Sequence, residues 1–306
     1  MKVDIVLFWL NSYDKEWQKD YLYYKNQELT NGTQLISNQQ AFGDERFRDW
    51  DTLKYWFRAI EQNCEWFNKI FLILYSPSQI PDWLDTTNPK LRIVYHSDYI
   101  PKQYLPTFNA LEIEHFIYKI EDLSEDFILF NDDVFVINKI PKDFYWKGEK
   151  LLLDPGPQYF RVPYSIWEKI VYNGMKLIQR DYPISLHYFS RHLANAHKKS
   201  AWTALANKYG DIIEKTFVSK FRHPNNYVTS WLIMDYYMCE HIAEKANLFK
   251  NSAYLELRYR MNWEGIKKYD MVCLNDVSSS INFESLKKDQ INFFESIFPN
   301  KSSFER

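Results

Sequence analysis

The stretch from Asp126 to Phe135 reads Asp-Phe-Ile-Leu-Phe-Asn-Asp-Asp-Val-Phe, so an apolar run ends in a carboxamide and two carboxylates. A buried parallel strand is a continuous apolar run, and ligands of open α/β sheets bind at the carboxyl ends of such strands. Oxygen ligands suit Mg²⁺ or Mn²⁺, which take their remaining ligands from water and substrate phosphate. Asp132 and Asp133 therefore indicate a metal site. The alternative is a strand-to-loop turn, because Asn and Asp also bond their own backbone there.

The size and charge of the chain limit its class. Its 306 residues can bury a large core and correspond to one elaborated α/β domain or to two domains. The 38 basic and 40 acidic residues give a net charge of −2, which predicts no nucleic-acid partner. The longest apolar runs, such as residues 69–75, are far shorter than the roughly 20 residues of a membrane-spanning helix. Without a signal-peptide pattern at the N-terminus, we expect a cytoplasmic protein with no transmembrane segment.

Cysteine and aromatic residues give weaker information. Cys64, Cys239 and Cys273 are widely separated among apolar neighbours, which predicts reduced core thiols rather than disulfides or a zinc site. Aromatic residues make up 18% of the chain, with 11 Trp and 23 Tyr. These side chains serve either as large core residues or as platforms on which sugar rings stack. Composition does not separate these two uses.

Apolar strand patterns alternate with amphipathic helix patterns along the chain. Strands are predicted over residues 3–10, 69–75, 91–95, 126–135 and 271–274. Helices are predicted after Asp14, over 52–67, 107–120, 165–180, 201–208, 227–246 and 285–298. This alternation predicts right-handed βαβ crossovers and a mainly parallel α/β sheet. Residues 150–250 are predicted to form a mostly helical insert, and the polar stretch 31–44 a loop able to move over a site.

Four separated blocks carry the pattern of a known family. They are residues 3–11 with Asp14 and Trp17; residues 46–49 through 105–109 and 113–114 to 130–133; His187 with residues 221–222; and residues 273–276. In content and order they resemble the Stealth family of sugar-phosphate transferases, bacterial capsule enzymes related to the catalytic subunit of the lysosomal-enzyme GlcNAc-1-phosphotransferase. The chain departs from the family pattern at residues 10–12, where the family has Asp-Gly, and at Ala110, where it has Ser.

The resemblance implies a GT-A-like, Rossmann-like fold with helices on both faces of the sheet, in a single catalytic domain over residues 1–306. It implies transfer of a hexose 1-phosphate from a UDP-sugar to an acceptor sugar hydroxyl, which forms a phosphodiester and releases UMP. The implied pathway is synthesis of a capsule or other surface polysaccharide. The implied acceptor is an oligosaccharide or lipid-linked glycan, which is compatible with peripheral association at membrane-bound assembly machinery.

Attack at phosphorus builds charge on the equatorial oxygens, so the resemblance gives the acidic blocks a metal-binding task. Asp132 and Asp133 are expected to bind Mg²⁺ or Mn²⁺, with Asp133 preferred for direct coordination. Asp276 ends another strand and is expected to complete the metal shell. The neighbouring Asn131 and Asn275 are expected to bind the donor. Simple turn chemistry stays open for Asn275 and Asp276.

Three arginines are candidates for the phosphates. Arg222 is expected to act in catalysis as a phosphate clamp, because guanidinium presents a planar fork to phosphate oxygens. A surface salt bridge is the alternative for this residue. Arg46 and Arg48 precede a helix whose N-terminus itself favours phosphate, so one is expected to touch the donor while the other pairs with Asp49 or Asp51.

The remaining candidates are a histidine and three residues for donor binding. His187, the one of three nearby histidines at the family position, is the candidate general base, since imidazole titrates near working pH. A structural hydrogen bond is the alternative. Asn109 is expected to touch the donor, and Glu114 the sugar or an arginine behind it. Asn11, at the departure from the family pattern, is a further donor-binding candidate.

Two other classes of protein fit parts of the sequence. A metal-dependent GT-A glycosyltransferase also holds UDP through an acidic motif, but it attacks the sugar carbon and releases UDP. A non-catalytic glycan-binding protein makes use of the Trp and Tyr surplus. It has no need for the acidic pair, Arg222 and the strand end at residues 275–276 together.

Overall fold

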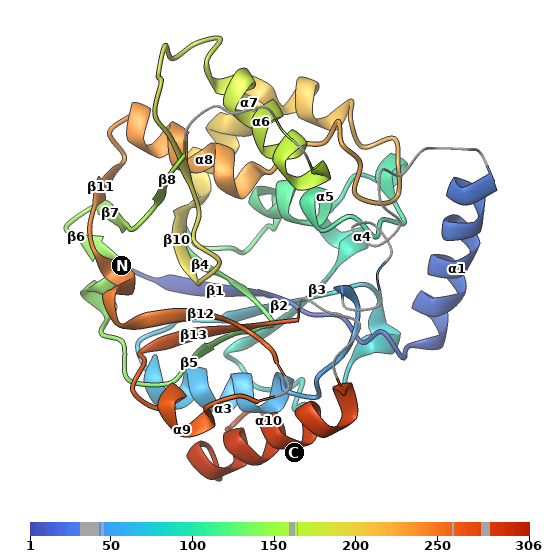
Figure 1. The fold of residues 1–306 in the computed structure, drawn as a ribbon, viewed down its shortest axis with the longest axis vertical. Helices are drawn as coiled ribbons and strands as arrows, with labels where there is room; N and C mark the ends of the chain where they lie inside the picture. Colours follow the sequence, from blue (N-terminus) through green and yellow to red (C-terminus); the bar gives the residue numbers. More distant parts are fainter. Residues whose placement is uncertain (31–42, 44–45, 159–162, 164, 259, 277–281) are drawn as a thin grey trace.

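A computed structural model describes the chain except for residues 31–42, 44–45, 159–162, 164, 259 and 277–281 (Figure 1). Its centre is a five-stranded sheet in the order β10-β4-β1-β2-β3. The strands are β1 (Val3–Phe8), β2 (Ile70–Leu74), β3 (Leu91–Tyr95), β4 (Asp126–Asn131) and β10 (Asn195–Lys198). The first four are mutually parallel and β10 is antiparallel to β4. The predicted mainly parallel α/β sheet is therefore confirmed.

Apolar helix faces cover the central sheet because each helix must bury its hydrophobic stripe. Helix α3 (Leu53–Asn63) buries Trp56, Phe57 and Ile60, at the predicted spacings. Figure 1 shows α3, α9 (Trp263–Ile266) and α10 (Phe283–Ile297) on one side of the sheet. On the other side lie α5 (Ala110–His115), α6 (Ile166–Ile178), α7 (Lys199–Glu214) and α8 (Thr229–Cys239). The sheet is thus the middle layer of three.

The predicted strand over residues 126–135 is two strands that belong to different sheets. β4 pairs with β1, whereas β5 (Val134–Val136) pairs antiparallel with β13 (Met271–Asn275), which is parallel to β12 (Ser252–Glu256). Asp132 and Asp133 form the turn between the two pairings. The backbone N–H of Leu274 donates to the carbonyl of Asp133 at 2.8 Å, which fixes this turn against β13. The turn is therefore confirmed, and it places both carboxylates at the edge of the sheet, while metal binding by them stays a prediction.

Residues 150–250 are more mixed than predicted. They contain α6, α7 and α8, and Ser165 with Glu168 forms the expected capping box at the start of α6. They also contain β7 (Lys150–Leu153), β8 (Gly156–Gln158), β9 (His187–Phe189), β10 and β11 (Ala243–Lys245). The helix predicted over 227–246 ends at Cys239, because His241 adopts a φ of 56° and turns the chain into β11. β11 pairs with β7, and β7 with β6 (Trp146–Lys147).

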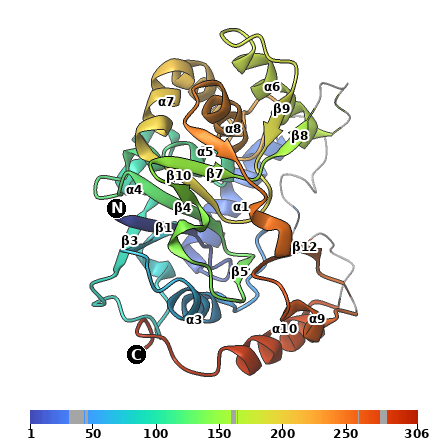
Figure 2. The same cartoon turned by 90° about the vertical axis from the view of Figure 1, so that its left-hand side faces the viewer.

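The remaining elements lie at the edges. Helix α1 (Lys15–Thr30) stands beside the body and buries Trp17 and Tyr21. The helix predicted over 107–120 is α5 followed by the 3-10 turn η4 (Ile117–Lys119), and α4 (His96–Tyr99) precedes it. Short 3-10 turns complete the fold: η2 (Pro77–Gln79), η3 (Lys102–Tyr104), η5 (Lys142–Phe144) and η6 (Leu248–Asn251). Seen from the side, α9 and α10 lie at the opposite end of the molecule from α6, α7 and α8 (Figure 2).

Three further predictions concern cysteines, membranes and the polar loop. All three cysteines are free; Cys64 and Cys273 are buried as predicted, whereas Cys239, also predicted in the core, is only half-buried. Among the helices of the described residues, none combines the length and the apolar character that crossing a bilayer requires. The loop predicted over residues 31–44 lies outside the described residues except for Gly43.

Candidate active site

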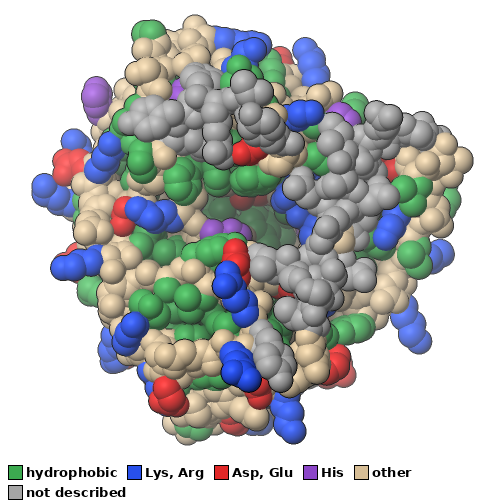
Figure 3. Space-filling view, in the orientation of Figure 1, with side chains coloured by type: hydrophobic (Ala, Val, Ile, Leu, Met, Phe, Trp, Pro, Cys, Tyr) green, Lys and Arg blue, Asp and Glu red, His purple; other side chains and the backbone are tan. Residues whose placement is uncertain are grey.

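A cavity of about 370 Å³ opens where β1 and β4 end. Trp9 and Leu10 follow β1 into its wall, and Asn131, Asp132 and Asp133 follow β4. In the space-filling view, a hollow with histidine and acidic side chains at its rim lies near the middle of this face (Figure 3). The parallel strands therefore deliver polar side chains to the edge where α/β sheets bind ligands.

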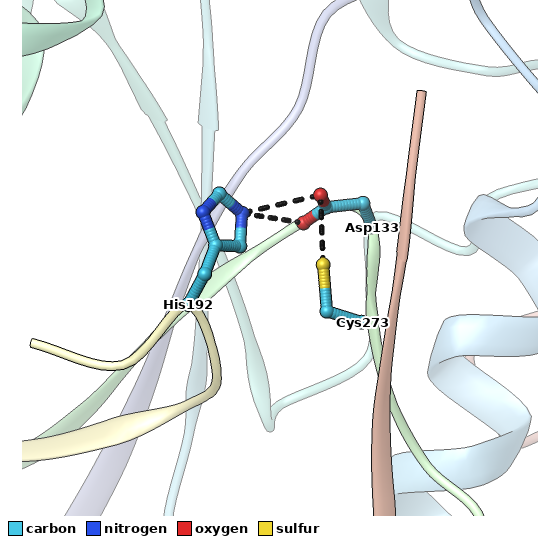
Figure 4. Close-up of side chains that lie close together, drawn as sticks. All are labelled: Asp133, His192 and Cys273. Atoms are coloured by element: carbon cyan, nitrogen blue, oxygen red, sulfur yellow. Dashed lines mark hydrogen bonds and ion pairs between the residues drawn. The ribbon is translucent and has the colours of Figure 1, made fainter. Parts of the chain in front are cut away.

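The acidic turn contacts a histidine and a cysteine from other parts of the chain (Figure 4). Nε2 of His192, between β9 and β10, lies 3.1 Å from Oδ2 of Asp133 and 3.3 Å from its Oδ1. Sγ of Cys273, on β13, donates to the same Oδ2 at 3.2 Å. Oxygen, nitrogen and sulfur atoms therefore converge on one carboxylate at the cavity.

The surroundings change the protonation of this cluster. Asp132 is exposed on the cavity side, and protein atoms crowd around its carboxyl. This burial, with the negative charge of Asp133, raises the pKa of Asp132 to about 7. Burial opposes the cationic form of His192, but the charge and hydrogen bond of Asp133 outweigh it and raise the pKa of His192. Of this cluster, Asp132 is therefore the carboxyl whose pKa lies near neutral pH.

Two predicted arginines line the same cavity. Burial, together with the neighbouring positive charge of Arg46, lowers the pKa of Arg222 to about 9. The Arg222 guanidinium lies 5.0 Å from the centre of the Trp167 ring. Among the described residues, its buried Nε has no hydrogen-bond partner. A buried guanidinium nitrogen without a partner is costly, so it suits an anionic ligand rather than a surface salt bridge.

Glu114 reaches the cavity from α5, as predicted. Its Oε1 accepts a hydrogen bond from the backbone N–H of Ser230 at 2.9 Å. Burial raises the pKa of Glu114 to about 7, and Ser230, Arg222 and His192 limit the rise. The carboxyl group thus lines the cavity together with Arg222 and His192, whose charges act on it, and its sugar-binding role stays a prediction.

Asn109 and Asn11 are not among the residues that line the cavity. Asn109 is fully buried as the N-cap of α5, where its Oδ1 accepts from the N–H of Leu111 and its Nδ2 donates to Asn226. The Oδ1 of Asn11 accepts from the N–H of Tyr13 in the turn after β1. Both side chains thus make local bonds that shape the walls, and their donor-binding roles stay predictions.

The second predicted strand end also turns away from the cavity lining. Nη2 of Arg48 donates to Oδ1 of Asp276 at 2.7 Å, and both side chains are largely buried. Nδ2 of Asn275 donates to the hydroxyl of Tyr254. Arg48, one of the two arginines considered for pairing with Asp49 or Asp51, thus forms an ion pair with Asp276. The metal role of Asp276 and the donor roles of Asn275 and Arg48 stay predictions.

His187 is placed behind the cavity and not in its lining. Its side chain is 1% exposed, and its Nδ1 lies 2.6 Å from Oδ2 of Asp235 on α8. The other carboxylate oxygen of Asp235 accepts from the backbone N–H of Tyr188 at 2.7 Å. This placement matches the structural alternative; of the histidines that line the cavity, His192 is the one that contacts the acidic turn.

Sequence reasoning missed His192, Cys273 and Trp167 as members of the site. His192 and Asp133 are 59 residues apart in the chain, so no local spacing links them. Cys273 stands inside an apolar strand and resembles a core residue. The usable signal was the cluster of histidines at 187, 192 and 197, of which only one was chosen.

The donor set fits a divalent ion. Asp133, His192 and Cys273 each offer one ligand atom, and these atoms lie within 4.8 Å of one another. Asp132 adds a second carboxylate at the same turn. Two carboxylates and an imidazole suit Mn²⁺ and, through the carboxylates, Mg²⁺. Of the three residues that the sequence assigned to a metal, Asp133 belongs to this donor set and Asp132 lies beside it, whereas Asp276 pairs with Arg48.

The cavity lies at the carboxyl edge of a parallel sheet and is lined by carboxylate, imidazole and guanidinium groups. Such a site is typical of an α/β enzyme that binds phosphate. Comparison with known proteins narrows this class. The model of Stealth protein CR2, conserved region 2, matches residues 46–153, and that of Stealth protein CR4, conserved region 4, matches residues 266–306.

Curated relatives match over nearly the whole chain. A capsular polysaccharide phosphotransferase WcwK of Streptococcus pneumoniae is 32% identical over 99% of this chain and 99% of its own. The exopolysaccharide phosphotransferase cps2G of Lactiplantibacillus plantarum is 27% identical, with 99% and 96% covered. The receptor polysaccharide phosphotransferase WefC of Streptococcus oralis is 28% identical, with 99% of both chains covered. The chain belongs to the Stealth family, and it is a phosphotransferase.

Among solved structures, one described as "Crystal Structure of a Mycobacterial Protein" aligns with 99% of this chain and 76% of its own at 11% identity. Its TM-score is 0.34, too low to bear on the fold or the site.

Proposed function

We propose that the protein transfers a hexose 1-phosphate from a UDP-sugar to a hydroxyl of a glycan acceptor, forming a phosphodiester and releasing UMP. The relatives named above act, by their names, on capsular, exopolysaccharide and receptor polysaccharides, which supports a glycan acceptor. The observation that carries the proposal is the shared cavity, which has Asp132 and Asp133 on one wall and Arg46 and Arg222 in the same lining.

The acidic wall and the arginine-bearing wall of the cavity suit different parts of a bound diphosphate. Asp132 and Asp133 would hold Mg²⁺ or Mn²⁺, and a bound ion supplies positive charge to the diphosphate oxygens. Arg222 presents its unpartnered Nε to equatorial oxygens, where charge develops during attack at phosphorus. Trp167 holds this guanidinium in place through its ring face. Binding and charge stabilisation thus come from side chains already fixed in the cavity.

The acceptor hydroxyl requires a base. His192 lines the cavity next to the acidic turn, whereas His187 does not line it. We therefore assign the proton acceptor to His192 and a positioning role to His187. Glu114, held by the N–H of Ser230, is placed to bind a sugar hydroxyl. Proton removal at the acceptor and charge stabilisation at the donor then occur at different walls of one cavity.

A glycosyltransferase that releases UDP is the second candidate, because an acidic turn and a metal serve it equally well. Incubation of the protein with a panel of UDP-sugars, Mg²⁺ or Mn²⁺ and short glycan acceptors separates the candidates by product. UMP with a phosphodiester-linked product supports the proposal, and UDP with a glycoside overturns it. Binding of glycan without turnover of any donor favours a non-catalytic protein. The same assay with lipid-linked acceptors tests whether the acceptor glycan is lipid-linked.

A further inference from the structure

We propose that Asp133, His192 and Cys273 form a binding site for a borderline transition-metal ion such as Zn²⁺ or Co²⁺, with the cysteine sulfur as a ligand. This site differs from the expected Mg²⁺ or Mn²⁺ site in its donors, since it takes the sulfur of Cys273. It does not rest on the proposed transfer reaction, because it follows from the positions of three side chains.

The distances are close to those of a tetrahedral metal site. Zn–N and Zn–O bonds near 2.0 Å and Zn–S bonds near 2.3 Å place neighbouring ligand atoms about 3.3 to 3.6 Å apart. Oδ2 of Asp133 lies 3.1 Å from Nε2 of His192 and 3.2 Å from Sγ of Cys273. All three ligand atoms lie within 4.8 Å of one another. Small rotations of the side chains are therefore enough to admit an ion between them.

Three separate elements hold these side chains, so the arrangement does not depend on one loop. Asp133 stands in the turn between β4 and β5, Cys273 lies on β13, and His192 lies between β9 and β10 (Figure 4). Val134, next to Asp133, pairs with Cys273 in the sheet register, which fixes the carboxylate beside the thiol. His192 closes the cluster from the cavity, leaving a fourth ligand position for water.

The chemistry of the donors sets which ion is preferred. Mg²⁺ binds oxygen and gains little from sulfur, whereas Zn²⁺ and Co²⁺ bind imidazole and thiolate well. When the metal–sulfur bond forms, the proton that Cys273 now donates to Asp133 leaves to solvent. An ion bound in this way engages both Asp133 and His192. Neither side chain can then bind another ligand in the cavity.

Cobalt provides the test, because a Co²⁺–thiolate bond gives a charge-transfer absorption in addition to the visible bands of tetrahedral Co²⁺. The metal-free full chain is titrated with Co²⁺ and compared with Cys273→Ser and with Cys239→Ser, which removes a thiol outside the cluster. We expect the charge-transfer band in the wild type and in Cys239→Ser, and its loss in Cys273→Ser. A band that persists in Cys273→Ser, or no band in the wild type, overturns the proposal.

A second variant covers the case in which Cys273→Ser does not fold. His192→Gln alters a side chain at the cavity and leaves the sulfur in place. We expect the charge-transfer band to survive while the affinity for Co²⁺ falls by at least about tenfold, since even losing a partner behind a ligand costs that much. An unchanged affinity overturns the assignment of His192 as a ligand.

Discussion

Asp235 on α8 contacts the first two residues of β9: its Oδ2 lies 2.6 Å from Nδ1 of His187, and its Oδ1 accepts from the N–H of Tyr188 at 2.7 Å. Both His187 and Asp235 are almost fully buried. The chain that leaves β9 carries His192 into the cavity. The buried pair therefore supports the segment that presents the cavity histidine.

Replacing Asp235 should destabilise the protein. Asp235→Asn keeps the shape but weakens two hydrogen bonds in a buried site, so we expect the free energy of unfolding to fall by about 1–3 kcal/mol. Urea denaturation followed by circular dichroism measures this loss. Asp211→Asn, at an exposed position on α7, is the matched control and should change stability by less than about 0.5 kcal/mol. Equal stability of the two variants would show that the buried pair contributes nothing.

Substitutions of His192 and His187 should have opposite effects on turnover and on stability. His192→Gln should reduce kcat by about 10²-fold or more, the usual contribution of a general base, and leave stability within about 0.5 kcal/mol. His187→Gln should lower the unfolding free energy while the folded fraction keeps most of its kcat. Turnover assays and urea titrations on both variants give the comparison. If His187→Gln loses kcat at full stability and His192→Gln does not, the base is His187.

Replacing Arg222 with lysine should lower the catalytic efficiency. Arg222→Lys keeps the charge but removes the planar fork and the flat contact with Trp167, so we expect kcat/KM to fall by about 10²-fold. Arg180→Lys, an exposed position at the end of α6, is the control and should be indistinguishable from the wild type. Steady-state kinetics with the donor varied measures both. Near-normal rates for Arg222→Lys would mark this arginine as structural.

Glu112 makes stability depend on pH. It is fully buried, and burial raises its pKa to about 8, although a hydrogen bond from Thr107 limits the rise. The folded state therefore keeps a proton that the unfolded chain loses near pH 4.5, so stability falls as pH rises from about 4.5 to 8. The slope is at most about 1.4 kcal/mol per pH unit.

The variant Glu112→Gln removes this titration while keeping an acceptor for the Thr107 hydroxyl. Its melting temperature should approach or fall below that of the wild type at pH 5 and exceed it at pH 8.5. Glu149→Gln, at an exposed position, should follow the wild type across the whole range. Parallel curves for Glu112→Gln and the wild type would mean that the carboxyl ionises normally in the folded protein.

Local patterns were enough to predict the central sheet. The apolar runs at residues 3–8, 70–74 and 126–131 are buried on both faces, and only a parallel strand between helix layers explains such runs. The α3 spacing and the Ser165–Glu168 capping box were equally local signals. The split of residues 126–135 was not predictable, because it depends on β5 pairing with β13, about 140 residues away.

The sequence predicted the site residues that directly follow a buried strand. It missed the site residues that come from distant segments of the chain. Asp132 and Asp133 follow a buried strand, so their placement at the cavity follows from the sheet. His192 and Cys273 reach Asp133 from 59 and 140 positions away, and their own neighbourhoods carry no sign of this contact. For Asp276, the sequence showed the strand end but not its partner, Arg48.

The Arg48–Asp276 ion pair allows a test of whether Asp276 acts on a metal or on its arginine. The pair is largely buried and joins the segment that carries Arg46 to the end of β13. If Asp276 acts through Arg48, then Arg48→Ala and Asp276→Ala lower kcat/KM by similar factors, and the double variant loses little more, giving a coupling energy of about 0.5–3 kcal/mol. The Mg²⁺ concentration for half-maximal activity should stay unchanged in Asp276→Ala and rise in Asp133→Asn. Additive losses, with a rise in the Mg²⁺ requirement for Asp276→Ala, would return Asp276 to the metal shell.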